Sequence, residues 1–266
     1  EEVIRTIGDI DGVIHFAALK SVTESIADPI KYYTENLESL LSIIEVANQK
    51  KVKSFIFSSS ATVYGDTIES CVKEETPLGK TLNPYGHTKI LGEKILQSGK
   101  HEFKTILLRY FNPVGAHYSA KIGELPNGSP NNLVPYLTQT AAGIRDKLTV
   151  FGNDYNTKDG TCIRDFIHVV DLAEAHVASL DYSTSMAEDI DIFNVGTGQG
   201  ITVLELISTF ENVNNLRINY SLGERREGDI EAIYTDTSKI KSKLNWMAIK
   251  DLSTSMKDSW EWEKML

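Results

Sequence analysis

The chain has 266 residues, of which 37 are Asp or Glu and 27 are Lys or Arg, so its formal net charge is −10. An acidic surface repels polyanions, which argues against nucleic acid as a partner. Because the sequence contains no run of about 18 apolar residues, we expect no membrane span. The two cysteines, Cys71 and Cys162, lack a metal-ligand spacing. We interpret them as free thiols of a cytoplasmic protein and expect no metal site.

Short apolar strands alternate with amphipathic helices through the first half of the chain. We expect strands over residues 12–17, 54–58 and 105–110, and helices that begin near Pro29 and Pro84. Apolar residues recur at spacings of three and four in the first helix, which predicts a buried face of Ile30, Tyr33, Leu37, Leu40, Leu41 and Ile44. Continuous apolar strands are typical of a parallel sheet that is covered on both faces.

The second half begins less regularly. Gly, Pro and Asn crowd residues 123–132, which predicts a loop that leaves the sheet, followed by a helix through Ile144. A strand is expected over residues 191–195. The pair Thr202 and Glu205 has the capping-box spacing of a helix start. The tail, residues 252–266, has an amphipathic helical pattern.

The most informative pair of residues is Tyr85 and Lys89. Four residues apart on a helix, they share a face. A tyrosine has an ordinary pKa of about 10, too high for a base at neutral pH, and a nearby ammonium would lower it. Such a tyrosine could take a proton from a sugar hydroxyl. By itself this spacing is common in helices, and a chance surface pair is then the better explanation.

Hydroxyl side chains mark the end of the strand that precedes this helix. Ser58, Ser59 and Ser60 close the strand, and Ala61 and Thr62 follow. Side chains at the carboxyl end of a parallel strand face the ligand crevice of an α/β sheet. Alone, a serine-rich strand end is also consistent with a simple turn.

Together these residues resemble the Ser-Tyr-Lys triad of the extended short-chain dehydrogenase/reductase family, and in particular its UDP-glucose 4-epimerase branch. Further segments that match the branch in order are VIHFAALK at 13–20, RYFNPVGA at 109–116, PNNL at 130–133, FGNDY at 151–155, RDFIHV at 164–169, NVGTG at 194–198 and RREGD at 225–229. Each motif has a structural explanation by itself, and their joint occurrence in family order supports the resemblance.

The resemblance implies a role for each matching position. Tyr85, Lys89 and Ser60 would be catalytic. The residues expected to bind NAD are Phe16, Ala17, Ala18, Lys20, Asn36, Ser59, Tyr85, Lys89 and Phe111. The residues expected to bind the UDP-sugar are Ser60, Tyr85, Asn112, Asn132, Leu133, Phe151, Arg164, Arg226, Asp229 and Ile233. Guanidinium groups such as these suit phosphate oxygens.

The implied activity is interconversion of UDP-glucose and UDP-galactose in galactose metabolism. NAD would oxidise the sugar at C4, and hydride would return to the other face of a 4-keto sugar. Ile233 is intermediate between the tyrosine of members restricted to plain hexoses and the small residue of members that accept N-acetylated sugars. Related 4,6-dehydratases carry an Asp-Glu pair where this chain has Ala61 and Thr62, which disfavours dehydration.

The fold implied by the resemblance is α/β, a doubly wound, Rossmann-like parallel sheet with a smaller C-terminal α+β substrate domain. The resemblance begins after the first three strands of that sheet, and no G-x-x-G-x-x-G turn is present, so we expect a truncated NAD-binding domain. We assign residues 1–112 and 163–200 to it, and residues 113–162 and 201–266 to the UDP-sugar domain. The alternative is a non-catalytic fragment, or a UDP-sugar-binding remnant that cannot hold NAD. The resemblance also implies a homodimer built on the helices near 30–49 and 84–98.

Overall fold

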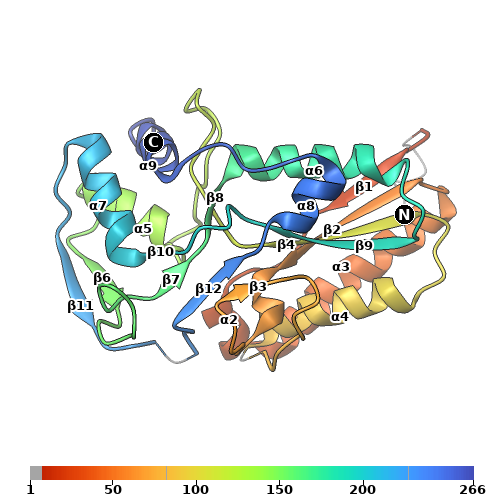
Figure 1. The fold of residues 1–266 in the computed structure, drawn as a ribbon, viewed down its shortest axis with the longest axis horizontal. Coiled ribbons are helices and arrows are strands. Elements are labelled where there is room, and N and C mark those ends of the chain that lie inside the picture. The colour runs from red at the N-terminus through yellow and green to blue at the C-terminus, as the bar shows by residue number, and fades with distance from the viewer. Residues whose placement is uncertain (1–7, 82, 227) are drawn as a thin grey trace.

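A parallel sheet forms the centre of the molecule. The computed structural model describes residues 8–81, 83–226 and 228–266. Four strands in the order β1-β2-β4-β9 pair in parallel throughout (Figure 1). Their bounds are β1 Gly12–His15, β2 Ser54–Ser60, β4 Lys104–Tyr110 and β9 Ile190–Val195. The strands predicted from the sequence are all found, with ends shifted by one or two residues.

Helices cover both faces of this sheet, which confirms the doubly wound α/β prediction. On one face lie α3, Pro29–Gln49, and α4, Pro84–Ser98; on the other lie α6, Val169–Ser183, and α8, Ser238–Leu244 (Figure 1). Leu40 and Leu96 pack with Phe57 in one core, and Leu172 and Ile240 pack in a second core across the sheet. Each face therefore buries its own apolar surface.

The buried face of α3 differs from the predicted one. Tyr32, Asn36, Leu40, Ile44 and Ala47 are buried, whereas Ile30 and Leu41 are 77% and 51% exposed. Two apolar stripes run along this helix, and one is offset from the other by one or two residues. The stripe that includes the polar Asn36 faces inward. The sequence pattern could not choose between them because Asn36 counted against the correct stripe.

A second group of elements packs around its own core. Helices α5, Leu133–Ala141, α7, Val203–Asn214, and α9, Leu252–Glu263, surround buried residues that include Leu137, Phe210 and Met256. The capping box at the start of α7 is present as predicted, and α5 ends before Ile144, shorter than predicted. The short strands outside the central sheet include β5 Asn112–Val114, β6 Leu148–Phe151, β7 Ile163–Arg164, β8 Phe166–His168, β10 Ile201–Thr202, β11 Tyr220–Gly223 and β12 Ala232–Thr235. Of these, β6 and β11 pair with each other, and β6 packs into this second core.

The division into two domains at the predicted boundaries stays a prediction. Ile240 and Trp246, which fall in the predicted substrate domain, pack instead with α6 and β9 on the sheet. The remaining short elements are α2 Val22–Ala27, the 3-10 helix η1 Ala61–Tyr64 and β3 Cys71–Val72. Among the described residues, no helix has the length and apolar character needed to cross a membrane.

Candidate active site

Tyr85 lies at the start of α4, against the end of β2. Pro84 occupies the first turn of the helix, and the Asn83 side chain accepts a hydrogen bond from the Gly86 N–H at 2.8 Å, which caps it. Strand β2 ends at Ser60, whose hydroxyl accepts from the Thr62 N–H at 3.3 Å and lies near enough to Tyr85 to affect the pKa of its phenol. The structure therefore places the predicted Ser60 and Tyr85 near each other.

Lys89 lies one turn further along α4 and is 5% exposed. Its ammonium donates to the Ser58 carbonyl at 2.6 Å and lies 6.0 Å from the centroid of the Tyr85 ring. It also lies 5.0 Å from the centroid of the Phe57 ring. The helix spacing thus places both functional groups at the carboxyl end of β2, as predicted.

Burial controls the pKa values of both groups. Burial raises the pKa of Tyr85, and the nearby Ser60 side chain offsets part of this rise. Burial lowers the pKa of Lys89 to about 8. The expectation that Lys89 lowers the pKa of Tyr85 is not met in the chain by itself, because desolvation disfavours the charged form of each group. A cation bound beside the phenol would act in the expected direction.

A cavity of about 200 Å³ opens beside Ser60. Six predicted site residues line it: Ser60, Phe111, Asn112, Arg164, Asp229 and Ile233. Thr62 lines it too, and its buried hydroxyl has no hydrogen-bond partner among the described residues. An unpaired buried hydroxyl facing a cavity suits a ligand that carries hydroxyl groups.

Arginines on one side of this cavity are paired with a carboxylate. Asp229 lies 3.5 Å from an Arg164 nitrogen and 3.4 Å from the Arg226 Nε. The Arg226 guanidinium also lies 4.6 Å from the centroid of the Phe151 ring. Buried Asp165 accepts hydrogen bonds from the 197–198 turn and from Thr235, which fixes the backbone next to Arg164. These predicted substrate residues therefore form one contiguous group.

The segment that follows β1 presents the predicted cofactor residues Phe16, Ala17, Ala18 and Lys20. Phe16 is 56% exposed, and its ring centroid lies 4.7 Å from that of His176. Asn36 is buried, and its side chain accepts from the Leu19 N–H at 2.7 Å and donates to the Leu19 carbonyl at 3.1 Å. Asn36 thus shapes the backbone of this segment.

Ser59 does not line this site, which corrects the prediction. Alternation along β2 turns it to the face opposite Ser58 and Ser60, where it is 1% exposed and donates to Glu93 at 2.5 Å. Glu93 forms a buried ion pair with Arg109 at 2.7 Å, with side chains 0% and 3% exposed. The serine thus belongs to a buried polar network that joins α4, β2 and β4.

Asn132 and Leu133 lie on α5, outside the cavity beside Ser60. Asn132 precedes the first residue of α5 and donates to the Glu124 carboxylate at 2.8 Å. The same carboxylate forms an ion pair with Lys20 at 2.9 Å. Leu133 packs against the core of the second group. One carboxylate therefore joins a predicted cofactor residue to a predicted substrate residue.

Sequence reasoning missed three residues of this region. The Tyr110 hydroxyl is hydrogen-bonded to His176 Nε2 at 2.5 Å. Glu93 follows Lys89 by one helical turn, so the shared face of Tyr85 and Lys89 could have signalled it. The roles of Tyr110 and His176 depend on contacts between distant segments, which the local sequence does not reveal.

Comparisons with known proteins agree with this geometry. The NAD dependent epimerase/dehydratase family matches residues 1–196. The UDP-glucose 4-epimerase of Bacillus subtilis is 49% identical over 258 residues, covering 96% of this chain and 76% of that protein. The structure of UDP-glucose 4-epimerase from Bifidobacterium longum in complex with NAD⁺ and UDP matches with a TM-score of 0.92 and 46% identity, covering 97% of this chain and 77% of that one.

A second solved structure gives the same result. It is the UDP-glucose 4-epimerase from Stenotrophomonas maltophila with bound NAD and formylated UDP-arabinopyranose, with a TM-score of 0.93, 43% identity and coverage of 96% of this chain and 76% of that one. The sequence resemblance is thereby confirmed along nearly the whole chain. The chain belongs to the NAD dependent epimerase/dehydratase family.

Proposed function

We propose that this protein interconverts UDP-glucose and UDP-galactose by NAD-dependent oxidation and reduction at C4 of the sugar, through a 4-keto sugar, in galactose metabolism. The observation that carries the proposal is the grouping of Ser60, Tyr85 and Lys89 where β2 ends and α4 begins, with the Lys89 ammonium 6.0 Å from the centroid of the Tyr85 ring. Ser60 also lines a cavity whose other lining side chains include Asn112, Arg164 and Asp229. The relatives named above have this activity in their names.

The described residues fit the nicotinamide end of NAD. The exposed segment 16–20 lies at the carboxyl end of β1, next to the strand end that carries Ser60, where α/β sheets bind such ligands. The backbone of this segment is held by Asn36. When bound, NAD supplies the hydride acceptor and donor.

Proton transfer falls to this chain's own side chains. Tyr85 takes the proton from the sugar 4-hydroxyl and later returns it. Ser60, which lines the cavity near Tyr85, orients the same hydroxyl. Lys89, whose pKa burial lowers to about 8, supplies positive charge next to the phenol when protonated. A cationic nicotinamide would favour the phenolate further.

Substrate binding falls to the group that surrounds Asp229. Arg164 and Arg226 offer guanidinium groups for the diphosphate, and Phe151 offers a ring face for uracil. Asn112, Asn132 and Leu133 complete the predicted UDP contacts. Ile233 is 4% exposed and lines the cavity, so its size limits the sugar, and N-acetylated UDP-sugars stay an open substrate class.

We further propose a homodimer, a cytoplasmic location and the two-domain division given above. Exposed Ile30 and Leu41 form an apolar stripe on α3, and such stripes suit an interface between two copies. Light scattering of the purified chain tests the dimer. A monomeric mass at micromolar concentration would contradict it.

An assay of UDP-galactose with and without added NAD⁺ tests the proposed function. NMR of the sugar anomeric protons should show UDP-glucose forming until the two sugars reach equilibrium. NAD released from the denatured protein should be quantified in the same sample. Saturable UDP binding without conversion at saturating NAD⁺ would favour the alternative, a UDP-sugar-binding remnant.

A further inference from the structure

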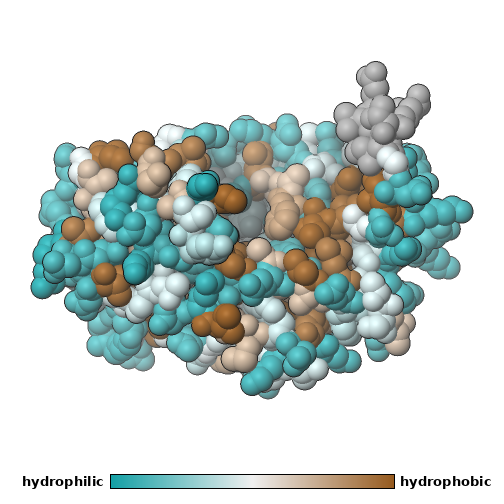
Figure 2. Space-filling view, turned by 90° about the horizontal axis from the view of Figure 1, so that it is seen from above, coloured by the Kyte–Doolittle hydropathy of each residue, from teal (hydrophilic) through white to brown (hydrophobic). Residues whose placement is uncertain are grey.

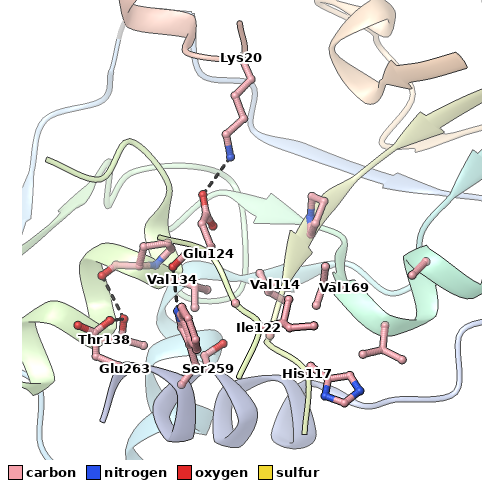
Figure 3. A pocket seen from close by; sticks show the side chains of 17 residues that line it. Lys20, Val114, His117, Ile122, Glu124, Val134, Thr138, Val169, Ser259 and Glu263 are labelled. Atoms are coloured by element: carbon pink, nitrogen blue, oxygen red, sulfur yellow. Dashed lines mark hydrogen bonds and ion pairs between the residues drawn. The ribbon is translucent and has the colours of Figure 1, made fainter. Parts of the chain in front are cut away.

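Glu124 lies in the loop of residues 115–132, between the predicted cofactor and substrate residues. Its Oε1 accepts from the Lys20 ammonium at 2.9 Å and from the Asn132 side-chain amide at 2.8 Å. Figure 3 shows the Lys20 and Glu124 side chains pointing toward each other. Both residues line a cavity of about 480 Å³. Neither the family comparison nor the sequence motifs assign a role to Glu124.

Both side chains that donate hydrogen bonds to Glu124 are predicted to bind a nucleotide. Lys20 is predicted to bind the cofactor, and Asn132 is predicted to bind the UDP group. Asn132 makes no side-chain cap on α5, since its amide is directed to Glu124. A helix N-terminus attracts negative charge, and carboxylate and phosphate oxygens compete for the same donors.

We propose that the Glu124 carboxylate is an internal competitor of nucleotide phosphate, which occupies Lys20 and Asn132 in the empty site and is displaced when a nucleotide binds. The proposal rests on the proposed function for the identity of the nucleotide. The ion pair suits exchange because both partners are accessible, with side chains 68% and 36% exposed.

Displacement of the Glu124 side chain would also affect the rest of the loop of residues 115–132. The Trp262 indole on α9 donates to the backbone carbonyl of Glu124 at 3.0 Å. A side chain at Gly123 would meet the Trp262 ring at 2.4 Å, so the loop backbone lies directly on α9. Asn131 also donates to Ser21 at 3.2 Å, a second contact between this loop and the segment after Lys20. Figure 2 shows a hollow near the middle of the face seen from above.

Calorimetric titration at low salt tests the proposal with three probes: UDP, inorganic pyrophosphate and uridine. Glu124→Gln keeps an acceptor for Asn132 and removes the charge, so it should bind UDP and pyrophosphate about fivefold more tightly than the wild type. Uridine, which has no phosphate, should bind with unchanged affinity. Asp189→Asn is the matched control, because Asp189 also forms an exposed ion pair, with Lys104 at 3.0 Å, and the substitution changes net charge equally.

Lys20→Met breaks the same ion pair from the other side and should weaken phosphate binding. Opposite signs for the two variants separate competition from a general loss of structure. Equal or weaker binding of both phosphate probes by Glu124→Gln would overturn the proposal, as would a failure of both probes to bind that variant. Tighter pyrophosphate binding with no UDP or uridine binding would support it and contradict the proposed function instead. If Glu124→Gln does not fold, unchanged or tighter phosphate binding by Lys20→Met would overturn it.

Discussion

The two sides of the candidate site are built differently. Around Tyr85, the groups proposed for catalysis are held at the end of β2 and the start of α4, and Lys89 is 5% exposed and donates to the Ser58 carbonyl. On the nucleotide side, the cations are paired with the chain's own carboxylates: Lys20 with Glu124, and Arg164 and Arg226 with Asp229. The catalytic side is preorganised, whereas the nucleotide side must exchange partners when it binds a ligand.

This difference has a physical reason. A base that transfers a proton gains from fixed geometry and low dielectric. A phosphate site in an acidic chain with a net charge of −10 needs cations, and in the empty site those cations find carboxylates nearby. Substitutions on the catalytic side should therefore have larger effects than those at exposed ion pairs.

The largest effect is expected at Tyr85. Tyr85→Phe removes the proposed acid–base hydroxyl and keeps the ring, so the rate of UDP-galactose conversion should fall by about 10³-fold or more. UDP affinity should stay within about twofold, measured by calorimetry. A variant with near-normal turnover would show that another group transfers the proton.

The next largest effect concerns stability. Arg109→Met leaves the Glu93 carboxylate buried without its cation, which should lower the free energy of unfolding by about 3–5 kcal/mol in urea titrations. The double variant Glu93→Leu/Arg109→Met removes both charges and should recover much of that loss. Equal destabilisation of the single and double variants would contradict a charge-based explanation.

Replacing Lys89 should change the free energy of unfolding by less than replacing Arg109, and in the opposite direction. Burial lowers its pKa from 10.5 to about 8, so the unfolded chain takes up this proton first as the pH falls. Stability is therefore lost between about pH 10.5 and 8, and the buried charge is unfavourable at pH 7. Lys89→Met should raise the free energy of unfolding by about 1–3 kcal/mol near pH 7 while it abolishes turnover. The gain should shrink toward pH 10.5, and a pH-independent difference would be inconsistent with this cause.

The smallest effect is expected at an exposed pair far from the site. Asp189→Asn breaks the ion pair with Lys104, in which the aspartate side chain is 93% exposed. The free energy of unfolding should change by less than about 0.5 kcal/mol at moderate salt. A loss above 1 kcal/mol would show that exposed pairs matter more in this chain than the comparison assumes.

Local patterns in the sequence predicted the central sheet and α4, whereas the grouping of Ser60 with Tyr85 followed from the family resemblance. These patterns gave wrong predictions where one pattern was consistent with two different structures. Ser59 was assigned to the crevice although strand alternation places it opposite Ser60, so that error could have been avoided. The buried face of α3 was missed because the polar Asn36 lies in the stripe that faces inward. The pairs Glu93–Arg109 and Lys20–Glu124 could not be predicted, because their partners are 16 and 104 residues apart in sequence.

Epimerisation in D₂O tests the central claim most directly. If hydride leaves and returns at C4 through bound NAD, UDP-glucose formed from UDP-galactose should retain its C4 hydrogen and contain no deuterium there, as NMR can measure. Deuterium at C4, or no conversion at saturating NAD⁺, would contradict the account.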